Sequence, residues 1–290
     1  MLPFTHTEPI VPFREIVAYE ALWKDRSTSF KSLASMFARN PGARPSDFVK
    51  EHQIEELYET IQQMVLHNKI YNTHLLINGT FDYPVKLKDA KEPVELLYYT
   101  GNLDYLHTRC IAIVGTRKPT AKGLAKTAEL VKQLVADDFT IISGLASGVD
   151  TQAHTSAIEN GGRTIAVIGT PLNKVYPEEN TELQNKIALE HLLVSQVPFF
   201  RYTQQTYIGN KLFFNERNKT MSALSEATLI IEAGETSGTL IQARAALDQK
   251  RKLLIWEDCF LNKAITWPER FAEKGAVRVG SYEDIHKALH

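Results

Sequence analysis

The chain has 290 residues, with 43% hydrophobic and 23% charged side chains and a formal net charge of −1 at pH 7. At roughly 150 residues per domain, this length suits one large domain and a small one. The neutral balance excludes a protein coated in basic surface. A local cluster of cations can still bind phosphates, because salt screens each charge beyond about 8–10 Å.

The sequence also argues against secretion, membrane insertion and metal binding. No run approaches the ~18 consecutive apolar residues of a membrane helix, and the first residues lack the basic start and apolar core of a secretory signal. Cys110 and Cys259 form neither a metal-ligand cluster nor a disulfide framework. We therefore expect a cytoplasmic protein without membrane contact, metal or cofactor.

Helical patterns come first along the chain. Residues 14–24, 30–40 and 45–70 each place apolar side chains about three or four positions apart. This spacing predicts a small helical N-terminal domain over residues 1–75. Residues 76–107 are predicted to form a linker that packs on the core.

Strands and helices alternate over residues 108–290. Short, nearly all-apolar runs are typical of parallel strands buried on both faces. The predicted strands are 110–116, 139–144, 164–170, 227–234 and 252–256, and the predicted helices are 123–137, 149–162, 238–250 and 282–289. This alternation predicts an α/β fold with a doubly wound, mostly parallel sheet that binds ligands at the carboxyl ends of its strands.

The first predicted strand ends in residues suited to phosphate. Gly115 lets the backbone turn, and Thr116 and Arg117 follow it. The planar fork of an arginine matches phosphate geometry. Considered alone, Arg117 could equally be an ordinary surface arginine in a polar loop. Its position at the end of a strand favours the interpretation as an anion-binding residue.

The stretch "TIISGLASGVDTQAH", residues 140–154, joins a strand to a helix through a glycine loop. Gly144 and Gly148 permit positive φ and close backbone approach, so the loop's N–H groups can receive an anion. The loop also contains Ser143, Leu145 and Ala146. Asp150 is interpreted as a helix cap and His154 as a packed histidine, not as catalytic groups.

Two further strand ends carry similar residues. Gly169 ends one strand and Lys174 supplies charge in the loop after it. The other candidates stand at what we predict to be two helix starts: Arg217, Asn218 and Lys219, then Ser237, Gly238 and Thr239. Small hydroxyl and glycine residues at a helix start form a ready anion site, although they can also serve only as caps.

These loops, taken in order, resemble the DNA-processing protein A family, also called Smf. The resemblance rests on "VGTRKPTAKG", "IISGLASGVDTQAHTSAIENGG", "FFNERNKTMSALSEATLIIEAGETSGTLIQARAAL" and "GAVRVGSYEDIHKAL". It covers residues 75–290 well and the N-terminal helices more loosely. By position, Thr116 and Arg117 match a phosphate-gripping Ser-Arg pair of the family, and Glu178 stands where many relatives carry Lys or Arg.

The resemblance implies an extended Rossmann-like fold with a SAM-like N-terminal region. It implies a non-enzymatic protein that binds single-stranded DNA, protects incoming DNA in natural transformation, helps load a RecA-type recombinase and acts as a homodimer. In this interpretation, phosphates are held by the loop around residues 144–148 and by four cations: Arg117, Lys174, Arg217 and Lys219.

Two alternatives stay open. The pocket could hold a nucleotide or nucleotide-derived signal, with phosphoribohydrolase-like chemistry at Glu232 or Glu235, although the Pro-Gly-Gly signature of those enzymes is absent. The chain could also be a diverged member that serves in defence or a mobile element. Glu178 and the lack of a winged-helix segment are the only hints of that role.

Overall fold

The protein, described here by a computed structural model of residues 9–66 and 72–290, is built around one large sheet. Within these residues the sheet has nine strands in the order β1-β2-β6-β5-β4-β3-β7-β8-β9. The strands are β1 (His74–Ile77), β2 (Leu96–Gly101), β3 (Cys110–Val114), β4 (Thr140–Ser143), β5 (Thr164–Ile168), β6 (Leu192–Ser195), β7 (Ala227–Ile230), β8 (Lys252–Trp256) and β9 (Val277–Val279).

The seven strands from β6 to β9 across the sheet pair in parallel. From β3 the chain adds β4, β5 and β6 on one side, then returns to place β7 on the other side of β3. This reversal confirms the predicted doubly wound, mostly parallel sheet. Strands β1 and β2 extend the sheet beyond β6 as antiparallel additions.

Helices and short 3-10 turns connect these strands. In the N-terminal region they are α1 (Pro12–Leu22), α2 (Phe30–Arg39), η1 (Pro45–Phe48) and α3 (Glu51–Leu66). In the rest of the chain they are α4 (Val85–Lys88), η2 (Leu103–His107), α5 (Ala121–Ala136), α6 (Val149–Glu159), η3 (Glu178–Asn180), α7 (Thr181–Glu190), α8 (Phe199–Gln204), α9 (Tyr207–Leu224), α10 (Thr239–Asp248), α11 (Glu257–Leu261), α12 (Trp267–Ala272) and α13 (Tyr282–Leu289).

Both faces of the central parallel strands β3 to β7 are buried, as continuous apolar runs predict. Ile111 and Ile113 point into a core formed with α5, α6 and α13. The alternate residues Ala112 and Val114 point into a second core formed with α9, α10 and α12. The central sheet is therefore a layer between two layers of helices, which leaves the ends of its strands as the place for a ligand.

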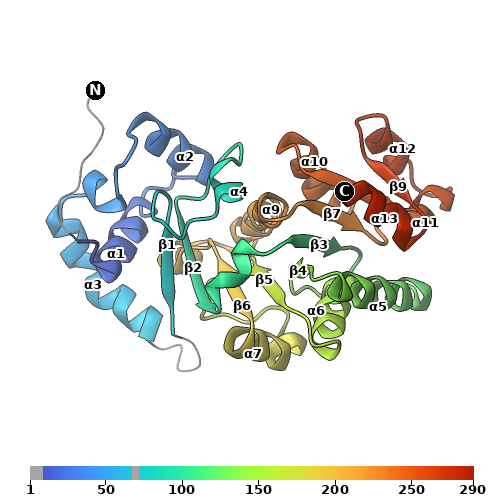
Figure 1. Ribbon diagram of the computed structural model, residues 1–290. Helices are drawn as coiled ribbons and strands as arrows, with labels where there is room; N and C mark the ends of the chain where they lie inside the picture. The colour runs from blue at the N-terminus through green and yellow to red at the C-terminus, as the bar shows by residue number, and fades with distance from the viewer. Residues whose placement is uncertain (1–8, 67–71) are drawn as a thin grey trace.

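The N-terminal helices lie at one end of the sheet, beside β1 and β2, while α11 to α13 lie at the other (Figure 1). Helices α1 and α2 confirm two predicted helices. The third predicted helix, 45–70, is divided into η1 and α3, and its residues 67–70 lie outside the described residues. Residues 76–107, predicted to pack on the core as a linker, contribute β2 and the end of β1 to the sheet itself.

Glu20 joins the N-terminal helices to the rest of the protein. Its side chain is fully buried. It accepts hydrogen bonds from the Tyr98 hydroxyl at 2.7 Å and from the backbone N–H groups of Phe199 and Phe200 at 2.8 and 3.0 Å. Burial raises the pKa of Glu20 to about 7, and these three hydrogen bonds partly oppose that rise.

Among the described residues, no helix has the length and hydrophobicity needed to span a bilayer.

Candidate nucleic-acid interface

A pocket of about 590 Å³ opens where β3 and β7 end. These two strands are neighbours, and the strand order reverses between them. Such a switch point leaves a crevice at the carboxyl ends of an α/β sheet, because the connections leave in opposite directions. The pocket is lined by residues 114–118 after β3, by residues 234 and 236–239 after β7, and by the inward side of α9.

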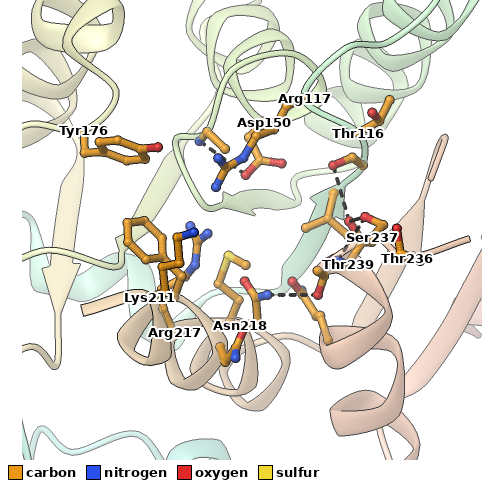
Figure 2. A pocket seen from close by; sticks show the side chains of 18 of the residues that line it. Thr116, Arg117, Asp150, Tyr176, Lys211, Arg217, Asn218, Thr236, Ser237 and Thr239 are labelled. Carbon is orange, nitrogen blue, oxygen red and sulfur yellow. Dashed lines mark hydrogen bonds between the residues drawn. The ribbon is translucent and has the colours of Figure 1, made fainter. Parts of the chain in front are cut away.

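One wall of the pocket is made of hydroxyl groups and glycine backbone. Thr116, Thr236, Ser237, Gly238 and Thr239 line it, as Figure 2 shows for the four side chains. The Ser237 and Thr239 hydroxyls lie 3.0 Å apart, and the Thr239 hydroxyl donates to the Gly115 carbonyl at 3.3 Å. This wall includes the start of α10, where the positive end of the helix dipole favours an anion.

Three exposed cations lie at the same pocket: Arg117, Lys118 and Lys211. None of them forms an ion pair with another residue in the part of the chain that the structure describes. Arg117 faces the Tyr176 ring, with Cζ 5.9 Å from its centroid, and the Lys211 Nζ lies 4.8 Å from the Tyr207 centroid. Their charges are therefore available to a ligand.

The opposite wall is aromatic, with Tyr176, Tyr202, Tyr207 and Phe214 lining it. Tyr176 lies across the cavity from the hydroxyl wall in Figure 2. The Tyr176 and Phe214 rings meet edge to face, with centroids 5.4 Å apart. The faces of aromatic rings stack on nucleobases regardless of the nucleotide sequence.

This aromatic wall and Lys211 were not predicted from the sequence. Their only signal was the concentration of aromatic and basic residues in "RYTQQTYIGNKLFFNERNK", residues 201–219. Aromatic residues in such a stretch look the same whether they fill a core or line a pocket. Phe213 and Phe214 illustrate this, since Phe213 is buried in the core and its neighbour lines the pocket.

The floor of the pocket contains buried polar residues. Arg217 is only 5% exposed, and its Nη1 donates to the carbonyl oxygens of Gly144 and, at 3.0 Å, of Val167. Burial lowers the pKa of Arg217 to about 10, and the nearby Asp150 carboxylate opposes that fall. Burial raises the pKa of Asp150, against the opposing effect of Arg217. Asn218 donates to the Gly238 carbonyl at 3.1 Å and so ties α9 to the hydroxyl wall.

Of the predicted site residues, the structure brings nine to the pocket: Gly115, Thr116, Arg117, Ala146, Arg217, Asn218, Ser237, Gly238 and Thr239. Others form its frame behind the lining. The buried Ser143 hydroxyl donates to the Ile113 carbonyl at 2.7 Å, and Leu145 is fully buried. Gly148 precedes α6 with φ 83°, and an added Cβ on Gly169 would lie 2.5 Å from the Phe214 ring.

Two predicted cations do not line the pocket. Lys174 is exposed in the loop after β5. Lys219 forms ion pairs with Glu92 at 3.3 Å and Glu216 at 2.9 Å. Because successive residues of a helix point about 100° apart, a helix that turns Arg217 and Asn218 to the pocket turns Lys219 away from it.

The prediction that Arg217, Asn218 and Lys219 stand at a helix start was wrong. They lie in the second half of α9, which begins at Tyr207 after the N-cap Thr206. The Thr206 hydroxyl accepts from the Gly209 N–H at 3.3 Å. The first turns of α9 expose apolar side chains, so they lack the amphipathic period that reveals a helix in a sequence.

The groups considered for catalysis are held in other contacts. The Glu232 carboxylate accepts from the N–H and hydroxyl of Thr120, both at 3.1 Å, and Glu235 pairs with Arg270 at 2.7 Å. Neither glutamate lines the pocket. His154 is buried with Nδ1 2.7 Å from the Thr164 hydroxyl, and burial lowers its pKa to about 3. Glu178 is exposed in η3, also outside the lining.

Residues 74–290, which include the whole sheet and this pocket, match the family model described as DNA recombination-mediator protein A. The chain belongs to this family. Among curated relatives, DNA processing protein DprA of Bacillus subtilis is 32% identical over 240 residues, covering 82% of this chain and 79% of the relative. DprA of Streptococcus pneumoniae is 36% identical over 203 residues, covering 70% of each chain.

Two solved structures of the family share the fold. The X-ray structure of DprA from Streptococcus pneumoniae superposes with a TM-score of 0.69 at 27% identity, covering 94% of this chain and 92% of the other. DprA from Helicobacter pylori, described for its single-stranded DNA binding mode, gives a TM-score of 0.64 at 27% identity and covers 76% of this chain and 96% of the other. Because the first covers 94% of this chain, the likeness to it includes the N-terminal region.

Proposed function

We propose that the pocket binds single-stranded DNA, with the sugar-phosphate backbone along the hydroxyl wall and the bases against the aromatic wall. The observation that carries the proposal is that unpaired cations, a helix start and aromatic faces share one pocket. A single strand needs these features together, because its phosphates are anionic and its bases have exposed faces. The Helicobacter pylori relative, which binds single-stranded DNA, supports the proposal.

The proposal includes no chemical step. The carboxylates considered for hydrolysis are engaged elsewhere, as Glu232 is with Thr120 and Glu235 with Arg270. The groups that line the pocket bind and orient a ligand. Because stacking and phosphate contacts do not read base edges, the protein should bind many sequences alike.

The test is a titration of labelled oligothymidine at several salt concentrations, with wild-type protein and Arg117→Met. Each phosphate contact on a single strand contributes about −0.7 to the slope of log K against log salt. Arg117→Met should weaken binding and make the slope less steep by about 0.7. Lys174→Met, an exposed cation outside the pocket, is the matched control and should change neither. Equal binding by wild type and Arg117→Met, or a preference for duplex DNA, would exclude the proposed site.

We also propose that the protein works with a RecA-type recombinase during DNA uptake and recombination, and does so as a homodimer. Membership of the family supports this part. Protein-coated oligothymidine should recruit the host recombinase faster than oligothymidine coated with Arg117→Met. Light scattering should give twice the mass of the 32.8 kDa chain. If the recombinase is recruited no faster, the proposed cooperation with it is contradicted. If light scattering gives the mass of a single chain at micromolar concentration, the proposed homodimer is contradicted.

A further inference from the structure

Two arginines of the pocket differ in their surroundings. Arg117 is exposed and has no ion-pair partner within residues 9–66 and 72–290, whereas Arg217 is 5% exposed in the floor. The Arg217 Nη1 is already a donor to the carbonyls of Gly144 and Val167. Gly144 directly follows β4 and Val167 lies in β5, so one side chain of α9 links the ends of two neighbouring strands.

We propose that Arg217, together with Asp150, is a positioning pair that shapes and neutralises the pocket floor, and that Arg217 does not itself contact a DNA phosphate. The inference rests on the proposed function, since it assigns a role within that same pocket. It separates Arg217 from Arg117, which approaches the strand directly.

The charges explain why the two residues must act as a pair. Asp150 is 6% exposed and lines a pocket that takes an anionic ligand. Its carboxylate receives the Ala146 N–H at 3.4 Å. The Arg217 guanidinium lies near it, since a Cβ placed on Gly144 would meet both groups, and its positive charge opposes the rise in the pKa of Asp150. Arg217 remains protonated at neutral pH, since its lowered pKa is still about 10. Loss of Arg217 alone would leave a buried carboxylate facing the phosphates and two carbonyls without their donor.

The space around Gly144 supports the same role. A Cβ added at Gly144 would overlap the Arg217 guanidinium and approach the Asp150 carboxylate. The glycine therefore leaves room for the pair, and the loop after β4 is built around it. If Arg217 only contacted a phosphate, its guanidinium would not need to pack so closely against Gly144.

The experiment compares four proteins: wild type, Arg217→Met, Asp150→Asn and the double variant that combines both substitutions. Oligothymidine affinity is measured from low to moderate salt, and thermal unfolding is recorded for each protein. We expect Arg217→Met to weaken binding about tenfold or more at every salt concentration, with the salt slope of wild type. Adding Asp150→Asn should restore most of the affinity, because it removes the unbalanced carboxylate. Arg117→Met serves as the comparison, with its slope less steep by about 0.7.

A slope for Arg217→Met less steep by about 0.7, with no recovery in the double variant, would overturn the inference and make Arg217 a phosphate contact. If Arg217→Met does not fold, the slope of the double variant decides between the same two outcomes. If wild-type protein binds no single strand, the proposed function fails, and the pair is judged from unfolding alone. Recovery in the double variant of part of the melting temperature lost in Arg217→Met would then support the pair, and additive losses would overturn it.

Discussion

At the scale of single residues, Gly144 behind the pocket floor and Gly234 in the pocket lining have opposite tolerance for a side chain. Gly144 lies against the Arg217 guanidinium, so an added methyl group has no room, whereas Gly234 has no atom within 4 Å of an added Cβ. Neither has a positive φ. The difference between the two sites is therefore one of space alone.

We expect Gly144→Ala to lower the free energy of unfolding by about 1–3 kcal/mol, as overpacking of a filled interior does. Gly234→Ala is the matched control and should stay within about 0.5 kcal/mol of wild type. Urea unfolding followed by circular dichroism measures both. Similar unfolding midpoints for the two variants would show that the floor around Arg217 can adjust to a larger loop residue.

At the scale of elements, α9 contributes two of the four aromatic lining residues, Tyr207 and Phe214. Phe214 lines the pocket and packs against Tyr176, while Leu212 on the same helix is 63% exposed and does not line it. The helix thus provides a test site and a control site two residues apart.

Replacing Phe214 with Leu keeps an apolar side chain but removes the aromatic face. A stacked base contributes about 1–3 kcal/mol, so the dissociation constant for oligothymidine should rise by roughly 5-fold to 160-fold with an unchanged salt slope. Leu212→Ala should bind as wild type does. Fluorescence anisotropy at two salt concentrations measures the difference. A changed slope, or an equal effect of the two substitutions, would place the bases elsewhere.

Elements also differ in how well the sequence predicts them. Strands β3 and β5 were predicted because five consecutive buried apolar or small residues leave little ambiguity. Strand β6 begins two residues after helix α7 ends, with no glycine or proline between them, and β2 joins the sheet through an antiparallel pairing that no local pattern specifies. Long-range pairing decides such strands, so a single sequence reveals them poorly.

The residues of the candidate site also differ in how well the sequence predicts them. Thr116, Arg117 and Ser237 could be predicted because their residue types at strand ends indicate phosphate. Lys174 and Lys219 were placed with them on residue type alone, and only tertiary structure shows which cations turn toward the pocket. The burial of Arg217 could not be predicted either, since it depends on the carbonyl groups of Gly144 and Val167, which are far away in sequence.

At the scale of the whole molecule, Glu20 makes the attachment of the N-terminal helices sensitive to pH. Its folded pKa is about 7 and its ordinary value 4.5. Between these values the folded protein keeps the proton that the unfolded chain has lost, so stability falls as pH rises. His154, with a pKa lowered to about 3, contributes in the opposite direction, and Glu95, with a pKa raised to about 7, in the same one.

Comparison with Glu20→Gln isolates the contribution of one residue, because the other groups are common to both proteins. From pH 4.5 to 7, wild-type protein should lose up to about 3 kcal/mol of unfolding free energy relative to the variant, at 1.36 kcal/mol per pKa unit. Chemical denaturation at four or five pH values within this range measures the difference. Curves that run parallel would mean that Glu20 keeps an ordinary pKa in the folded protein.

The position of the pocket at the end of β3 and β7 has a consequence for how the protein can change over generations. The sheet pairing between these strands ends at Val114 and Ile230, before the lining residues that follow them. Mutations in those loops can therefore alter the ligand while every strand keeps its register. Arg217 and Asp150 are the exception, because their contacts reach back into the sheet and its helices. Where the ligand of this fold changes, we expect single substitutions to be enough at the rim of the pocket, whereas a change of the floor needs a paired substitution of Arg217 and Asp150.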